Sequence, residues 1–194
     1  PRIPRPARAS GLHLHDRRTY EPYNKHLLRV ALRLIEELGI VDPETIASAP
    51  VHDGIEDHPQ LLVVRYLDRI PPADPHTLHA LGREALGVFA SRHEASSLAD
   101  IVFDVSTPPP LSRETKQAEY IDFVTRLMNE GDARSRALKT ADFLDNTDLS
   151  SGLEKTSKRR YLDRKQILLY HAVIRAMEQD DSLIIGEARD ATTD

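Results

Sequence analysis

Apolar side chains recur at helical spacing along most of the chain, and this periodicity constrains the fold more than any other feature. Over residues 27–38 they repeat at steps of three and four positions and stop at Gly39, as in an amphipathic helix that ends on a glycine cap. Strand patterns are few: residues 61–64 form a short apolar run, and residues 101–105 fit either a strand or a helix. The sequence therefore predicts an all-α fold.

Start signals place further helices along the chain. Asp42, Pro43 and Glu44 are typical of an N-cap followed by a proline in the first turn, and they predict a helix that continues as far as Ile55. Similar signals and the apolar spacing predict the remaining helices over roughly residues 78–89, 112–127, 137–144 and 161–178.

The length of 194 residues suits one domain with a single sizeable core. We expect that domain over residues 11–186, with a mobile tail at 1–10 and an acidic tail at 187–194. Hydrophobic residues make up 40% of the chain and charged residues 29%, a balance that excludes disordered and membrane-embedded classes. No apolar run is long enough to cross a bilayer, and no secretory signal is visible, so a cytoplasmic protein without a membrane partner is expected.

Charge and cysteine content restrict the ligands. The chain has no cysteine, so any bound metal must be held by nitrogen and oxygen atoms. A net charge of −5 argues against a nucleic-acid backbone as the main partner. A small anionic ligand remains compatible, because local basic clusters such as Arg17-Arg18 are present.

Four ionisable residues are concentrated in a predicted helix that is otherwise apolar. His52, Asp53, Glu56 and Asp57 lie there, and on a helix His52 pairs with Glu56, and Asp53 with Asp57, one turn apart. Imidazole and carboxylate together suit Mn²⁺, Fe²⁺ or Zn²⁺, and such an ion can activate a water near neutral pH. A His-Asp pair alone is unspecific, since it also occurs in solvated or capped turns.

The segment at residues 52–57 and three other stretches match one known protein family, and they occur in the order in which that family carries them. They are RRTYEPYNKH at residues 17–26, HDGIED at 52–57, LKTADFLDN at 138–146 and, more weakly, residues 98–107. Together they resemble the HD superfamily of phosphohydrolases and, within it, the hydrolase domain of the RelA/SpoT alarmone enzymes and the single-domain small alarmone hydrolases. The resemblance covers about residues 13–150 and implies a helical bundle with a metal site in the core of the helices.

The resemblance also implies roles for individual residues. The metal ligands would be His26, His52, Asp53 and Asp142, with Mn²⁺ as the usual ion of this subfamily and other divalent metals as alternatives. Glu56 and Asp57 would activate and position the attacking water. Arg17, Arg18 and Asn146 would contact the nucleotide.

The reaction implied is hydrolysis of guanosine tetra- or pentaphosphate at the 3′ position, which releases pyrophosphate and leaves GDP or GTP. The partner would be a small phosphorylated nucleotide, with no role for nucleic acid. No synthetase domain accompanies the matching segment, so a hydrolase-only role is expected.

Several positions depart from the family pattern, and they leave alternatives open. Tyr20, Leu27, Phe143, Asp145 and Leu149 replace residues common in the alarmone hydrolases, and we expect these changes to affect the substrate pocket more than the metal site. An HD phosphohydrolase for another phosphorylated nucleotide, or a non-catalytic nucleotide-binding regulatory module, therefore remains as an alternative.

Overall fold

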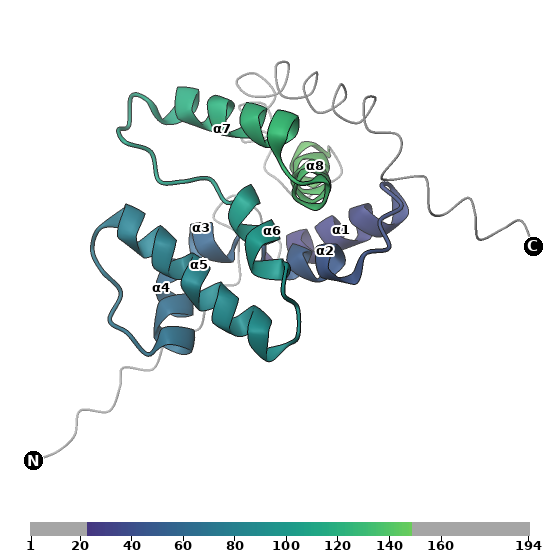
Figure 1. The fold of residues 1–194 in the computed structure, drawn as a ribbon. Helices are drawn as coiled ribbons and strands as arrows, with labels where there is room; N and C mark the ends of the chain where they lie inside the picture. Colours follow the sequence, from purple (N-terminus) through teal and green to yellow (C-terminus); the bar gives the residue numbers. More distant parts are fainter. Residues whose placement is uncertain (1–22, 149–194) are drawn as a thin grey trace, which may run out of the picture.

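The computed structural model describes residues 23–148, and within this range the secondary structure is helical, with no strand (Figure 1). The predicted all-α fold is confirmed, and the two ambiguous apolar runs are both helical. The helices, in chain order, are α1 (Tyr23–Glu36), α2 (Pro43–Ser48), the 3₁₀ turn η1 (Ala49–Val51), α3 (Gly54–Asp57), α4 (Pro59–Leu62), the short π-helix η2 (Val63–Leu67), α5 (Pro75–Arg92), α6 (Leu98–Val105), α7 (Lys116–Glu130) and α8 (Ala133–Thr147).

Some sequence predictions fall outside the described residues. These are the two tails, the helix expected over 161–178, the basic pair Arg17-Arg18, and the pattern departures at Tyr20 and Leu149. The limits of the expected domain at residues 11 and 186 lie outside as well.

Local signals determine where the helices begin and end. The Asp42 carboxylate accepts a hydrogen bond from the Thr45 N–H at 2.8 Å and so caps α2 as expected. Asp74 and Asp132 cap α5 and α8 in the same way. After α1, Gly39 adopts a φ of +65°, a left-handed conformation that favours glycine and turns the chain toward α2.

The helix predicted to run from Pro43 to Ile55 is interrupted, which corrects the sequence interpretation. The α-helix ends at Ser48, η1 follows, and His52 and Asp53 lie in a turn before α3. The physical reason is Pro50, which has no N–H to donate to the Ile46 carbonyl. That carbonyl accepts from the Ala49 N–H instead, and the chain tightens into a 3₁₀ turn.

Helix α6 lies at the centre of the molecule, between α3 and α5 on one side and α1, α2 and α8 on the other (Figure 1). Its Ile101 and Val105 side chains pack into one core cluster with buried residues of α1 and α8. Its Ala99 and Val102 side chains pack into a second cluster with Ile55 and buried residues of α5. Because α6 contributes to both clusters, it connects the helices that carry the candidate site.

A smaller cluster fixes α7 to α8. Val124 and Met128 of α7 pack there against Phe143 of α8. Among the described residues, none of the helices combines the length and the apolar character that crossing a membrane requires.

Candidate metal centre

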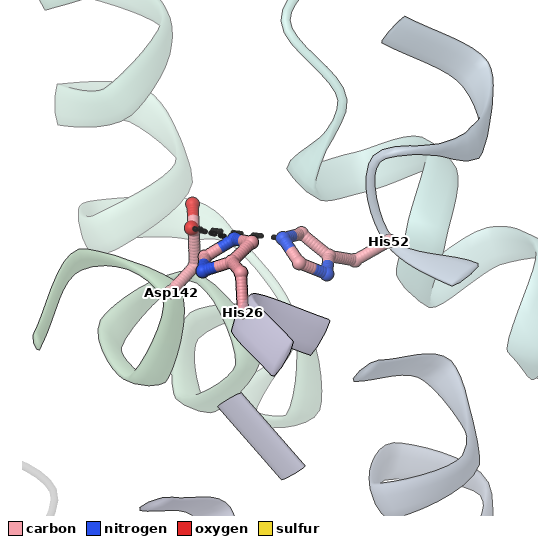
Figure 2. Close-up of side chains that lie close together, drawn as sticks. All are labelled: His26, His52 and Asp142. Atoms are coloured by element: carbon pink, nitrogen blue, oxygen red, sulfur yellow. Dashed lines mark ion pairs between the residues drawn. The ribbon is translucent and has the colours of Figure 1, made fainter. Parts of the chain in front are cut away.

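Three of the four predicted metal ligands meet in the structure. His26 of α1, His52 of the turn before α3 and Asp142 of α8 each offer a ligand atom, and these atoms all lie within 4.8 Å of one another (Figure 2). The Asp142 Oδ1 atom is 3.4 Å from His26 Nε2 and 3.6 Å from His52 Nε2. This group could hold a metal ion, and its donor set suits a divalent transition metal.

Asp53, the fourth predicted ligand, borders the same group. Its carboxylate oxygens lie 3.7 Å from His26 Nε2 and 3.0 Å from His52 Nε2. The Asp53 side chain is 22% exposed, whereas the His52 side chain is 1% exposed. Asp53 therefore lies on the accessible side of the group, while His52 lies at its buried end.

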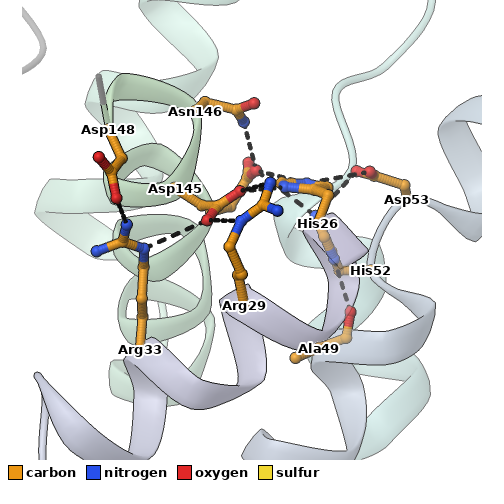
Figure 3. A network of polar contacts seen from close by, with 10 residues as sticks. His26, Arg29, Arg33, Ala49, His52, Asp53, Asp145, Asn146 and Asp148 are labelled. Atoms are coloured by element: carbon orange, nitrogen blue, oxygen red, sulfur yellow. Dashed lines mark hydrogen bonds and ion pairs between the residues drawn. The ribbon is translucent and has the colours of Figure 1, made fainter. Parts of the chain in front are cut away.

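The backbone break at Pro50 orients His52. The His52 Nδ1 atom lies 2.7 Å from the Ala49 carbonyl oxygen (Figure 3). Because a carbonyl only accepts, Nδ1 must carry the hydrogen, and Nε2 faces His26 and Asp142. Within the described part of the chain, the buried Nε2 atom makes no hydrogen bond of acceptable geometry. An unsatisfied imidazole nitrogen at this point fits a metal ligand.

His26 is oriented by a carboxylate in a similar way. Its Nδ1 atom lies 2.8 Å from Asp145 Oδ2, and its Nε2 atom faces Asp142 and Asp53 (Figure 3). The Asp145 carboxylate also accepts from Arg29 Nε at 2.7 Å. Both imidazoles are thus held through Nδ1, which leaves Nε2 for the group's centre.

The position of Asp145 corrects one expectation from the sequence. We expected this departure from the family pattern to affect the substrate pocket more than the metal site. Instead, Asp145 is buried behind His26, where it joins α8 to two arginines of α1. Its contacts therefore belong to the support of a candidate ligand.

Arg29 and Arg33 are site residues that the sequence analysis missed. A stripe of His26, Arg29 and Arg33 on α1 faces a stripe formed by Asp142 and Asp145 of α8 and its C-cap residue Asp148, and the contacts follow the same order along both stripes. Both stripes advance by three or four residues, the spacing of one helix face. Matching these stripes of opposite charge is the signal that would have paired α1 with α8.

Asp142 has further partners on its own helix. Asn146 Nδ2 donates to Asp142 Oδ1 at 2.6 Å, and Lys139 Nζ lies 3.3 Å from Asp142 Oδ2. Burial raises the pKa of Asp142, but Lys139 and the two imidazoles outweigh it and hold the pKa well below its usual range. Asn146, which was expected to contact a nucleotide, here orients a candidate metal ligand, and its nucleotide contact stays a prediction.

The imidazoles lie in a strongly negative environment. Burial lowers the pKa of His26, but hydrogen bonds to Asp142 and Asp145 outweigh it and raise the pKa to about 9. For His52, the charge of Asp53 and the contact with Asp142 likewise outweigh burial and raise the pKa well above its usual value. An environment that favours protons on these nitrogens also favours a cation between them.

The acidic pair after the candidate ligands lies on the short helix α3. Glu56 is accessible to solvent, and its Oε1 atom accepts from the Thr107 N–H at 2.6 Å. The surrounding protein desolvates this carboxylate and raises its pKa, against the lowering effect of Lys139. Asp57 is also exposed, and it is not a member of the group that could hold a metal.

The functional inference depends on this geometry and on the sequence motifs. No family model matches the chain, and neither a curated protein nor a solved structure matches it.

Proposed function

We propose that this chain is a metal-dependent phosphohydrolase of the HD type, in which His26, His52, Asp53 and Asp142 hold one divalent cation. The observation that carries the proposal is the meeting of two imidazoles and a carboxylate from three separate segments around the buried His52 Nε2 atom. Mn²⁺ is the metal we propose, because nitrogen and oxygen donors with an accessible side suit it and the family resemblance favours it.

The residues around this group have chemistry that suits hydrolysis. When bound, a divalent cation supplies positive charge to phosphate oxygens and acidifies a water molecule. Glu56 is an exposed residue whose carboxylate has a raised pKa, and it suits the transfer of a proton from the attacking water. Lys139 and Asn146 keep Asp142 ionised and oriented.

The proposed substrate is a guanosine nucleotide with a 3′-pyrophosphate. Water attacks the phosphorus atom that is bonded to the 3′ oxygen, and the bond between these two atoms breaks. The attacking water becomes part of the released pyrophosphate, and the 3′ oxygen takes up a proton and leaves as the 3′-hydroxyl of GDP or GTP. The support for this substrate is the similarity of residues 17–26, 52–57 and 138–146 to the alarmone hydrolases. Arg17, Arg18 and Asn146 are the proposed nucleotide contacts.

The test is an assay with purified, Mn²⁺-loaded protein and guanosine tetraphosphate. GDP and pyrophosphate are expected in equal amounts, and their formation should stop when EDTA is added. Asp53→Ala should abolish both Mn²⁺ binding and turnover. Asp122→Ala, which removes an exposed carboxylate of α7, is the matched control and should retain both. Absence of turnover by the metal-loaded wild-type protein would contradict this substrate.

The alternative nucleotide remains a candidate because Tyr20 and Leu149 depart from the alarmone-hydrolase pattern. A screen over phosphorylated nucleotides, run with the same Mn²⁺-loaded protein, distinguishes the two substrates. If every nucleotide binds but none is hydrolysed, the chain is a regulatory binding module and not an enzyme.

A further inference from the structure

Asp145 is a buried carboxylate of α8 that lies directly behind the candidate ligand His26. Its residue is 1% exposed, and it contacts three side chains of α1. His26 Nδ1 lies 2.8 Å from Oδ2, while Arg29 donates through Nε at 2.7 Å to Oδ1 and through Nη2 at 3.0 Å to Oδ2. Arg33 Nε adds a longer contact of 3.4 Å to Oδ1. Figure 3 shows the carboxylate between His26 and the two arginines.

The arrangement around Asp145 fixes the orientation of one imidazole. A carboxylate that accepts from Nδ1–H holds the ring in one plane and leaves the Nε2 lone pair for a metal. The His26 Nε2 atom does face Asp142 and Asp53, the two carboxylates on the other side of the ring. A carboxylate of this kind also increases the basicity of the ligating nitrogen.

Arg29 explains how Asp145 stays charged although it is buried. A buried carboxylate is costly unless it is paired and hydrogen-bonded. The two parallel contacts from Arg29 form a fork on both oxygens, the geometry in which a guanidinium binds a carboxylate most firmly. The Arg29 side chain is 29% exposed, whereas the Asp145 side chain that it binds is 2% exposed.

We propose that Asp145 is a positioning residue for the metal centre: it holds His26 with Nε2 directed at the cation, and Arg29 clamps its carboxylate in place. The proposal rests on the proposed metal-dependent function, and it assigns a role to residues that do not touch the metal themselves. If Asp145 only joined α1 to α8, its loss would not change which ring nitrogen of His26 carries the hydrogen.

The first measurement is Mn²⁺ affinity by isothermal titration calorimetry. Asp145→Asn keeps the shape of the side chain but removes its charge, and it should weaken Mn²⁺ binding by about 10- to 100-fold, the usual effect of losing such a supporting carboxylate. Arg29→Gln should weaken binding in the same direction by a smaller factor. Glu37→Gln is the matched control, because Glu37 binds Arg33 but does not reach His26; its Mn²⁺ affinity should equal that of the wild type.

The second measurement reports the tautomer directly. In two-bond ¹H–¹⁵N spectra of the Zn²⁺-loaded wild type, His26 should carry its hydrogen on Nδ1, and this signature should shift or broaden in Asp145→Asn but not in Glu37→Gln. Circular dichroism in EDTA shows whether each variant is folded. If Asp145→Asn is not folded, the two measurements on Arg29→Gln test the positioning role instead.

The outcomes separate the two proposals. The role of Asp145 is overturned if folded Asp145→Asn binds Mn²⁺ with wild-type affinity and shows an unchanged His26 signature. If only Arg29→Gln folds, the same result in that variant overturns it. In both cases the proposed metal site stands. If the wild-type protein binds neither Mn²⁺ nor Zn²⁺, the metal-dependent function fails and the positioning role fails with it.

Discussion

Asp142 is a buried carboxylate whose ionised form depends on its neighbours. Lys139 lies 3.3 Å from one oxygen, and Asn146 donates to the other at 2.6 Å. Lys139 is itself buried, and the charges of Asp142 and Glu56 outweigh its desolvation and raise its pKa well above the usual value. In a buried pair of this kind, removal of one charge leaves the other uncompensated.

Asp142→Asn should therefore have two separable effects. It removes a candidate metal ligand, so Mn²⁺ binding should be lost, and it strands the Lys139 ammonium, so the free energy of unfolding should fall by about 3 kcal/mol. The double variant Asp142→Asn/Lys139→Met should regain most of that stability without regaining Mn²⁺ binding. Urea unfolding in EDTA and calorimetric titration with Mn²⁺ measure the two effects.

The double variant also shows which results would contradict this prediction. If it is as unstable as Asp142→Asn alone, the stranded charge is not the cause of the loss. If either variant still binds Mn²⁺ with wild-type affinity, Asp142 is not a ligand.

At the scale of elements, the turn between η1 and α3 decides how His52 is presented. Pro50 prevents α2 from continuing, and the tight turn that follows leaves the Ala49 carbonyl available to His52 Nδ1. In an uninterrupted α-helix, the same carbonyl would accept from the Asp53 N–H. The break therefore exchanges the α-helical bond from the Asp53 N–H for contacts from the His52 N–H and from His52 Nδ1, and the second of these orients a candidate ligand.

Pro50→Ala should test this exchange. Alanine restores an N–H that can donate to the Ile46 carbonyl and allows α2 to extend toward His52. We expect weaker Mn²⁺ binding, by about tenfold, as for loss of a supporting contact, while stability changes by less than about 1 kcal/mol because residue 50 is exposed. Calorimetry and urea unfolding measure the two quantities. Unchanged Mn²⁺ affinity would show that the proline break is unrelated to the site.

Helix α5 carries an ionisable group that the candidate site does not use. His79 is buried beside Phe103 of α6, with ring centroids 5.3 Å apart. Within the described residues its Nε2 atom makes no hydrogen bond. Burial lowers the pKa of His79, and the nearby His76 lowers it further.

A lowered histidine pKa should make the α5–α6 contact sensitive to acid. The unfolded chain takes up the His79 proton near pH 6.5 and the folded chain only at lower pH, so this contribution to stability is present above about pH 6.5 and is lost as the pH falls. His79→Leu should lose less stability than the wild type as the pH falls below about 6.5. Urea unfolding in EDTA at several pH values measures the difference.

In this pH range the titration of His79 is separate from that of the candidate ligands His26 and His52. The pKa values of His26 and His52 are raised, so in metal-free protein their contributions are fully present below about pH 6.5 and are lost only as the pH rises, for His26 toward its pKa of about 9. His76→Leu, at an exposed position of α5, is the control and should keep most of the acid sensitivity. Equal acid sensitivity in His79→Leu and the wild type would contradict the assignment.

At the scale of the whole molecule, the sequence predicted what depends on local chemistry. Helical periodicity and the cap at Asp42 act within one element, and the structure contains both. The straight helix through His52 was wrong because Pro50 was not weighed against the surrounding apolar pattern. The support of His26 by Asp145 could not be predicted from spacing within one helix, since it depends on how α1 packs against α8.

The meeting of His26, His52 and Asp142 has the same origin in packing. Their positions are far apart in the chain, and only the shared core of α1, α6 and α8 brings the segments together. The family resemblance named these residues, whereas no periodicity did. A cation held by all three segments would therefore bind the folded chain and not the unfolded one.

Metal removal should consequently lower the stability of the whole domain. A ligand present at about 100 times its dissociation constant stabilises the folded state by about 3 kcal/mol, which for a domain of this size raises Tm by about 5 to 10 °C. Thermal unfolding should show this difference between protein in Mn²⁺ and protein in EDTA, and added Mn²⁺ should reverse it. His52→Ala should abolish the Mn²⁺-dependent rise, whereas His76→Ala, which removes an exposed imidazole of α5, should preserve it. A rise in Tm that survives in His52→Ala would place the stabilising Mn²⁺ elsewhere on the protein.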